Sequence, residues 1–332
     1  MKKIINATIS IGEQNKDKAK INHIAYGVDK NFLFGTGISL VSVLINNKEK
    51  FHFHIFTDFI NQDYIEKCKQ ITNKFETQIT LYLINTDVFS QLPVSAIWPK
   101  AMYFRLAIFD ILSEVSNKLL YLDADIVCKG SLSDFFNTDL SNHYAAVVAD
   151  LDAVQNRVEQ RLGIAGMKGK YFNSGVILAN LQEWKENNLT EKCFTALSDE
   201  TIRKKLHFMD QDLLNILLFN HTIILDNRYN CIYDGSEHFG RKDYANYKET
   251  ITDNTVLIHY TSDTKPWLKW VRYPAFAFFD NALAQSPWSD KDLMDASRIN
   301  QLKKKSKHEF YQGKHLSGIK TQLKYLWKKV VH

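Results

Sequence analysis

Residues 118–125 read Lys-Leu-Leu-Tyr-Leu-Asp-Ala-Asp, and this stretch decides the fold class. The residues from Leu119 to Leu122 are all apolar, so a strand formed by them is apolar on both faces. Such strands belong to sheets that are covered by helices on both sides. The stretch therefore predicts a central strand of an α/β sheet, which ends abruptly at the carboxylates Asp123 and Asp125.

The flanking sequence alternates short β-branched or aromatic runs with helical patterns, which indicates a mostly parallel sheet with helices on both faces. Before the central strand we predict strands over 21–28, 51–57 and 78–84 and helices over 33–46, 63–75 and 102–112. After it we predict strands over 144–149, 176–179, 222–225 and 255–260 and a helix over 211–219.

The composition excludes a disordered chain, because 45% of the 332 residues are hydrophobic and 13% are aromatic. The longest apolar-leaning run, 32–45, is interrupted by Gly and Ser and is shorter than the ~20 residues of a membrane span. Polar residues interrupt the N-terminal stretch, so we expect no secretory signal there. The four cysteines lack zinc or disulfide spacing, and a reduced cytoplasmic protein is the simplest interpretation.

Charge is distributed unevenly along the chain. Residues 298–332 carry ten Lys or Arg against one acid, Glu309, a net charge of +9. The whole chain carries +5, so residues 1–297 carry −4. This asymmetry favours a partner surface for the tail and argues against a chain-wide nucleic-acid binder.

Ligands of open α/β sheets bind beyond the carboxyl ends of the strands, where Asp29, Asp150 and His259 also stand. In an extended chain Asp123 and Asp125 point to the same side, ~7 Å apart at Cα, and can converge on one cation. Such oxygen ligands suit Mg²⁺ or Mn²⁺ bound to phosphates. The alternative is a solvated turn with an aspartate cap.

His259 ends a second apolar strand and is followed by a polar loop that leads to Lys265, Pro266 and Trp267. A lone histidine is usually structural, but here Lys265 could place an ammonium on a phosphate while Trp267 anchors the loop. An imidazole that joins two carboxylates would favour Mn²⁺ over Mg²⁺.

Two further polar motifs allow a functional and a structural interpretation. Asn173 and Ser174 precede a strand, and they either bond to sugar hydroxyls or form a turn. Asp210, Gln211 and Asp212 open a helix, where an aspartate is ordinarily a cap. The run is more polar than a single cap requires.

Together these motifs resemble glycosyltransferase family 8, in particular the branch that extends the lipopolysaccharide outer core with glucose or galactose. The resemblance covers roughly residues 20–270 and rests on five motifs in the family's order: His23 to Phe32, Asp123-Ala124-Asp125, Phe172-Asn173-Ser174-Gly175-Val176, Asp210-Gln211-Asp212 and His259 to Trp267.

The resemblance implies a GT-A-like nucleotide-diphospho-sugar transferase fold, a UDP-glucose or UDP-galactose donor, and retention of the α configuration. It implies Mn²⁺ as cofactor, with Mg²⁺ as the alternative. The matched positions assign the metal to Asp123, Asp125 and His259. They assign the nucleotide and diphosphate to Tyr26, Asp29, Asn31, Arg105, Ala124, Lys265 and the backbone of Ser262, where many members have glycine. The donor sugar would be surrounded by Asp150, Asn173, Asp210 and Gln211.

The tail shows helical spacing of its apolar residues, with lysines elsewhere on the wheel. The apolar positions are Leu316, Ile319, Leu323, Leu326, Trp327 and Val330. A basic amphipathic helix of this kind suits an anionic membrane surface. The alternative is a helix docked on the catalytic domain.

Three other functions compete with this interpretation. The LDADIV segment resembles the nucleophile strand of haloacid-dehalogenase-like phosphohydrolases, but that strand normally lies near the amino terminus and is followed by a paired-aspartate loop. A non-catalytic sugar-nucleotide-binding scaffold would not need the metal ligands. A nucleic-acid binder has only the basic tail in its favour and no recognition motif.

We therefore predict a retaining, metal-dependent hexosyltransferase acting on the lipopolysaccharide core at the cytoplasmic face of the bacterial inner membrane, with glucose preferred over galactose. We expect an N-terminal extension over 1–20, a catalytic domain over 21–265 and a helical, membrane-associating segment over 266–332. The expected partners are the UDP-sugar, the core acceptor and, through residues 298–332, an anionic membrane. No nucleic acid is expected.

Overall fold

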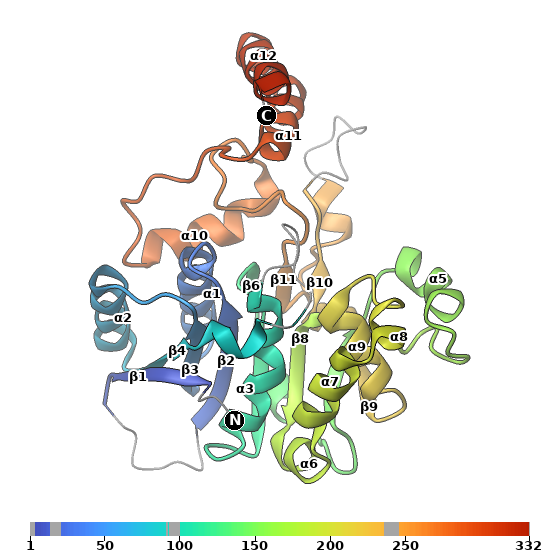
Figure 1. The fold of residues 1–332 in the computed structure, drawn as a ribbon. Coiled ribbons are helices and arrows are strands. Elements are labelled where there is room, and N and C mark those ends of the chain that lie inside the picture. The colour runs from blue at the N-terminus through green and yellow to red at the C-terminus, as the bar shows by residue number, and fades with distance from the viewer. Residues whose placement is uncertain (1–3, 14–20, 91, 93–99, 236–245, 332) are drawn as a thin grey trace.

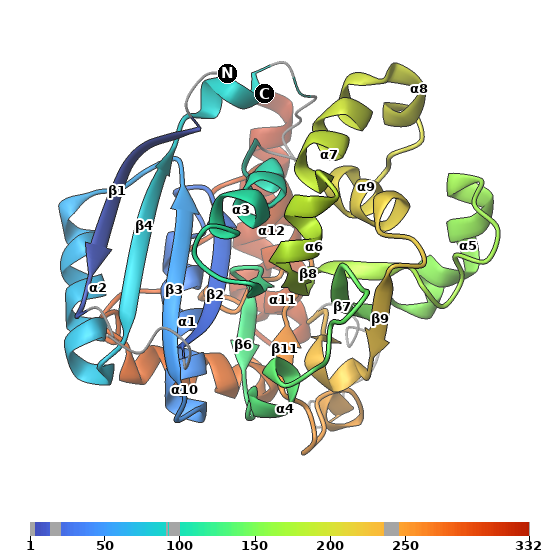
Figure 2. The same ribbon diagram turned by 90° about the horizontal axis from the view of Figure 1, so that it is seen from below.

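The computed structural model describes residues 4–13, 21–90, 92, 100–235 and 246–331. Their main feature is an eight-stranded sheet in the order β1-β4-β3-β2-β5-β8-β7-β9. Its first four strands lie side by side in Figure 2. The bounds are β1 Ile5–Ile11, β2 Ile21–Val28, β3 Lys50–Thr57, β4 Gln78–Ile84, β5 Lys118–Leu122, β7 Ala145–Ala149, β8 Phe172–Asn180 and β9 Thr222–Leu225.

The sheet is mixed, with parallel pairing in the majority. Four of its seven strand pairs are parallel: β2 with β3, β2 with β5, β3 with β4 and β7 with β9. Strand β8 runs antiparallel to both of its neighbours, β5 and β7, and β1 is antiparallel to β4. The predicted mostly parallel sheet is therefore confirmed, with one inverted strand beside the central one.

Helices cover both faces of the sheet, as the apolar character of β5 predicted. Leu120 and Leu122 of β5 pack in one core cluster with α1, α2 and α10, and Leu119 and Tyr121 pack in a second cluster with α3, α6, α7 and α9. The helices are α1 Leu33–Asn46, α2 Gln62–Phe75, α3 Phe104–Leu112, α4 Ser133–Phe136, α5 Asp152–Leu162, α6 Leu181–Glu186, α7 Leu189–Ser198, α8 Glu200–Arg203, α9 Met209–Leu217 and α10 Ala277–Gln285.

A second, three-stranded sheet continues the central strand beyond the two aspartates. It has the order β10-β11-β6, with β6 Ile126–Cys128, β10 Cys231–Ile232 and β11 Leu257–His259. Strand β11 is antiparallel to β6, and His259 lies opposite Ile126. This pairing brings the end of β11 beside the start of β6, and so beside Asp125.

Sequence patterns predicted seven of the eight strands of the main sheet and the helices α1, α2, α3 and α9, but not β1, β10, the helices α4 to α8 or α10. Residues 5–11, within the expected extension 1–20, form the edge strand β1, in which Ile5, Ala7, Ile9 and Ile11 alternate with polar residues as in a half-buried strand. The short strand β6 was not predicted either. Residues 1–3 and 14–20 of the extension lie outside the described part of the chain.

The C-terminal region is helical and basic, as predicted. After α10, the helices α11 (Ile299–Tyr311) and α12 (His315–Val331) pack against each other as a hairpin that extends away from the main sheet (Figure 1). Among the described helices, none is both long and apolar enough to cross a membrane. The four cysteines, Cys68, Cys128, Cys193 and Cys231, are free and buried.

Two tryptophans fix the chain after β11 to helix α1. A Cβ added at Gly35 would lie 2.6 Å from the ring of Trp267, and one at Gly37 would lie 2.4 Å from the ring of Trp288. Both indole rings are buried. The glycines of α1 therefore provide the space in which the C-terminal segment packs on the sheet.

We expect Gly37→Ala to lower the free energy of unfolding by about 1–3 kcal/mol, because its methyl group overlaps the buried Trp288 ring. Urea unfolding followed by circular dichroism measures this. Gly130→Ala is the matched control, since its Cβ would meet its nearest neighbour at 3.4 Å, an ordinary contact. Equal stability of the two variants would contradict the packing described.

Candidate active site

Two carboxylates and one imidazole converge beyond the end of β5. Asp123 and Asp125 lie in the turn between β5 and β6, and His259 is the last residue of β11. One ligand atom of each residue lies within 4.8 Å of the others. The Asp125 Oδ1–His259 Nε2 distance is 3.2 Å. The predicted convergence of these three residues is therefore present in the fold.

Lys265 forms an ion pair with the other oxygen of Asp125, Oδ2, and donates to the carbonyl of Tyr260 at 3.0 Å. Burial alone would raise the pKa of Asp125, but Lys265 and His259 outweigh burial and lower that pKa well below its usual range. Asp125 is therefore ionised at neutral pH although only 8% of it is exposed.

Gly175 and Asn230 position His259. A Cβ at residue 175 would lie 2.4 Å from His259 Cε1 and 3.0 Å from Asp123 Oδ2, so only glycine fits between them. Asn230 Oδ1 lies 3.0 Å from His259 Nδ1, which leaves Nε2 directed at Asp125. This is the arrangement expected of a metal-binding histidine, whose second nitrogen is fixed by a hydrogen bond.

Arg105, on α3, connects three parts of the site. It pairs with Asp123 Oδ1 at 2.8 Å and with Asp210 Oδ2 at 2.9 Å, and it donates to the Ser174 carbonyl at 2.7 Å. Burial would lower the pKa of Arg105, but the two carboxylates raise it, so the guanidinium stays charged. Its side chain is buried among these partners and lies over the ring of Tyr121.

Gln211 lies at the centre of a hydrogen-bonded group at the start of α9. Its Nε2 donates to Asp150 Oδ2 at 2.8 Å and to the Tyr171 hydroxyl at 3.0 Å. Its Oε1 accepts from the Ser174 amide at 3.1 Å and from Asn173 Nδ2 at 3.3 Å. The structure thus brings Gln211, Asp150 and Asn173 together, as the resemblance implied.

The two aspartates beside Gln211 are buried and paired. Asp212 is fully buried, and it accepts from the Tyr171 hydroxyl at 2.6 Å and pairs with Arg161 at 2.5 Å. It also accepts the backbone amides of residues 207 and 208. Burial raises the pKa of Asp210 to about 6, against the opposing effect of Arg105. Burial also raises the pKa of Asp150.

Asp29 and Asn31 follow the carboxyl end of β2, the parallel neighbour of β5, and the Asp29 carboxylate accepts the Asn31 amide at 2.7 Å. Both therefore lie at the sheet edge where Asp123 stands. Tyr26 is different, because its side chain is fully buried and its hydroxyl lies 3.1 Å from Ser39 Oγ. A contact from Tyr26 to a nucleotide would have to come from its backbone.

Ser262 adopts a φ of +67°, a left-handed conformation that favours glycine. This explains why a glycine fits the position in the family that the sequence resembles. Its hydroxyl donates to Asp234 and accepts from the amide of Thr264, so the loop that leads to Lys265 is internally bonded. Ala124 is buried between the two carboxylates, and its carbonyl oxygen faces Gly35 of α1.

Several residues of the site were not predicted. Asn230, Tyr171 and Arg161 stand in segments without a distinctive pattern, and their roles depend on contacts with residues 29, 41 and 51 positions away. Gly175 belongs to the predicted motif, but only the packing of His259 against it shows that this position requires glycine.

The donor set fits a divalent cation. Two carboxylates and an imidazole with a fixed tautomer are ligands that Mn²⁺ or a similar ion accepts. In the structure Arg105 pairs with Asp123 and Lys265 pairs with Asp125.

Comparison with known sequences agrees with this geometry. The profile described as glycosyl transferase family 8 matches residues 23–271, and the profile of the family 8 C-terminal region matches residues 273–329. The chain is 44% identical to a lipopolysaccharide 1,2-glucosyltransferase of Escherichia coli, over 93% of this chain and 91% of that protein. It is 37% identical to the lipopolysaccharide 1,3-galactosyltransferase of Salmonella typhimurium strain LT2, over 96% and 94% of the two chains.

Solved structures share the fold. The galactosyltransferase LgtC, in complex with donor and acceptor sugar analogues, superposes with a TM-score of 0.66 at 23% identity, over 80% of this chain and 96% of that one. An active-site mutant of LgtC gives 0.68 at 21% identity, with the same coverage. The predicted GT-A-like fold is therefore confirmed. With its family profile over residues 23–271 and these full-length relatives, the chain belongs to glycosyl transferase family 8.

Proposed function

We propose that this glycosyltransferase moves glucose from UDP-glucose to the outer core of lipopolysaccharide and retains the α configuration. The observation that carries the proposal is the convergence of Asp123, Asp125, His259 and Lys265 at one edge of the sheet. Relatives 44% and 40% identical are named lipopolysaccharide 1,2-glucosyltransferases, and they support glucose and the core acceptor.

Galactose is the second candidate donor sugar. A relative 37% identical over 94% of its own length is named a galactosyltransferase, and the two sugars differ only in the orientation of one hydroxyl. The phosphohydrolase alternative has lost its support, because the family profile covers the whole aspartate motif and the strand that precedes it.

We assign the metal to Asp123, Asp125 and His259, with Mn²⁺ as the preferred ion. The metal would stabilise the negative charge that develops on the departing UDP. Lys265 lies beside Asp125, and its ammonium group would offset the negative charge of the diphosphate. Asp29, Asn31, Ala124 and the backbones at Tyr26 and Ser262 would complete the nucleotide site.

Gln211, Asp150 and Asn173 would surround the donor sugar, and Arg105 and Asp210 would position them. The sugar becomes oxocarbenium-like when its bond to phosphate breaks, and nearby carbonyl or carboxylate oxygens stabilise that charge. Asp210 and Asp212 are buried in ion pairs, which makes either a poor nucleophile. We therefore favour attack by the acceptor on the face that the phosphate leaves, without a covalent glycosyl-enzyme.

Helix α12 supports membrane association of the C-terminal segment. Its apolar side chains Leu316, Ile319, Leu323, Leu326, Trp327 and Val330 are 47–87% exposed. The helix instead packs on α11 through small and polar residues: Gly318 contacts Phe310, and Gln322 accepts from Ser306 at 2.7 Å. An exposed apolar face flanked by lysines suits an in-plane position on an anionic bilayer.

We accordingly place the enzyme at the cytoplasmic face of the inner membrane, with residues 21–265 as the catalytic part and residues 266–332 as the membrane-associating part. Docking of α12 on the catalytic domain was the alternative, and the exposure of its apolar face argues against it.

We expect the chain to release UDP slowly from UDP-glucose in the presence of Mn²⁺, and more slowly from UDP-galactose. Asp125→Asn removes a metal ligand and should lower this release by about 100-fold or more. Asp139→Asn should leave this release unchanged, because Asp139 is an exposed aspartate that accepts from the Ser141 amide and hydroxyl. Coupled detection of UDP provides the measurement.

Faster release from UDP-galactose would reassign the donor. Equal activity of Asp125→Asn and the unaltered chain would contradict the metal site.

For the C-terminal segment, we expect the double variant Leu323→Glu, Trp327→Glu to bind about 100-fold more weakly to vesicles that contain anionic lipid. The reason is that two apolar side chains, which would move from water into the membrane, are replaced by charged ones. Sedimentation with vesicles measures this. Phe59→Glu is the matched control, since Phe59 is an exposed apolar residue that lies outside the C-terminal segment. Unchanged binding of the double variant would show that α12 does not face the membrane.

A further inference from the structure

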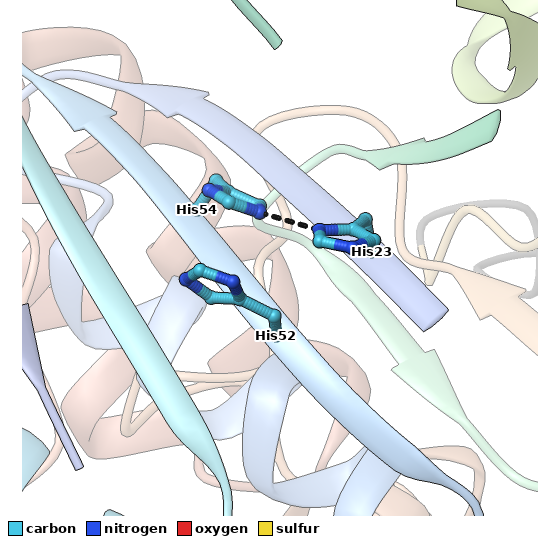
Figure 3. Close-up of side chains that lie close together, drawn as sticks. All are labelled: His23, His52 and His54. Carbon is cyan, nitrogen blue, oxygen red and sulfur yellow. Dashed lines mark hydrogen bonds between the residues drawn. The ribbon is translucent and has the colours of Figure 1, made fainter. Parts of the chain in front are cut away.

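Three buried histidines meet on the face of the main sheet that α3 covers, outside the catalytic site. His52 and His54 are two residues apart on β3, so their side chains lie on the same face. His23 stands opposite His52 on the neighbouring parallel strand β2. Figure 3 shows the three rings turned toward one another across the two strands.

The ring nitrogens are arranged around a common centre. His23 Nδ1 lies 3.0 Å from His54 Nε2, and one nitrogen of each of the three rings lies within 4.8 Å of the others. Three imidazoles bound to one zinc ion at 2.0–2.1 Å in tetrahedral geometry have nitrogens about 3.3 Å apart. Small side-chain movements would therefore bring the three rings to ligand distance.

The outer nitrogens of two rings are already fixed by hydroxyl groups on β4. His54 Nδ1 lies 3.1 Å from the Tyr82 hydroxyl, and His52 Nε2 lies 2.8 Å from Thr80 Oγ1. Metal-binding histidines normally have such a partner on the second nitrogen, which sets the tautomer and the ring orientation.

We propose that His23, His52 and His54 bind one divalent cation of the zinc class. Three imidazoles without a carboxylate select borderline metals such as Zn²⁺, Co²⁺ or Ni²⁺ over Mg²⁺ or Mn²⁺. The ion would use His23 Nδ1, His54 Nε2 and the inner nitrogen of His52, and a water molecule would complete the tetrahedron.

The cluster is accessible and distinct from the catalytic centre. His23 and His52 are 7% and 9% exposed, and His23 also lines a cavity of about 500 Å³ with Glu114, Lys118 and Phe136. His23 is near the amino end of β2, whereas Asp29 follows its carboxyl end, about 20 Å farther along the strand. A metal here would connect β2 to β3 and stabilise the sheet, without a part in sugar transfer.

The two sites can be separated by their ligand chemistry. We expect chelator-treated protein with Asp125→Asn, which disables the catalytic metal site, to bind one Co²⁺ per chain and to show the visible absorption of a tetrahedral nitrogen-ligated ion. Zn²⁺ should displace the Co²⁺ and raise the melting temperature, whereas Mn²⁺ should do neither. Adding His52→Gln should abolish the absorption.

His143→Gln in the same background is the matched control, because His143 lies outside the cluster in the turn before β7, where its Nδ1 lies 2.9 Å from the Ser141 carbonyl. It should retain the Co²⁺ spectrum. Absence of Co²⁺ uptake in Asp125→Asn protein, or an unchanged spectrum after His52→Gln, would overturn the proposal.

If His52→Gln does not fold, X-ray absorption of the zinc-loaded Asp125→Asn protein decides the question. Three imidazole ligands are expected, and fewer than three would overturn the proposal.

Discussion

Two carboxylates, the half-buried Asp123 and the buried Asp125, follow the end of β5 two residues apart, and the rest of the site depends on how their charge is balanced. Carboxylates so close repel each other, and burial costs them part of their hydration, so each needs a positive partner. Arg105 pairs with the first, and Lys265 and His259 face the second. Since Lys265 is 140 residues from Asp125, the site forms only when most of the chain has folded.

Strand direction explains why the remaining groups arrive at the same edge. Parallel strands β2 and β5 place their carboxyl ends side by side, whereas β8 runs antiparallel to β5 and brings its beginning there. The amide of Asp123 donates to the carbonyl of Gly175 at 2.9 Å, so the Asn173–Gly175 turn lies beside the carboxylates. The antiparallel pairing of β6 with β11 likewise brings His259 beside the carboxylates. Inverted strands thus gather polar residues that a wholly parallel sheet would separate.

The bounds of a helix or strand could be predicted from the sequence where the pattern that marks them is local. Helix α1 and strands β2, β4 and β9 have the predicted bounds, because apolar periodicity and flanking polar residues mark their ends. The direction of β8 and the pairing of β1 and β6 could not be predicted, since register depends on distant partners. The aspartates and His259 followed from their positions after apolar strands. Asn230, Tyr171 and the requirement for Gly175 depend on side-chain packing that no local pattern records.

The most direct test of the carboxylate site is a crystal of the full chain soaked with UDP and Mn²⁺, measured where manganese scatters anomalously. We predict one anomalous peak bonded to Asp123, Asp125 and His259, with the diphosphate between that peak and Lys265. A manganese peak elsewhere, or well-defined UDP without manganese at these three residues, would contradict the assignment of the site.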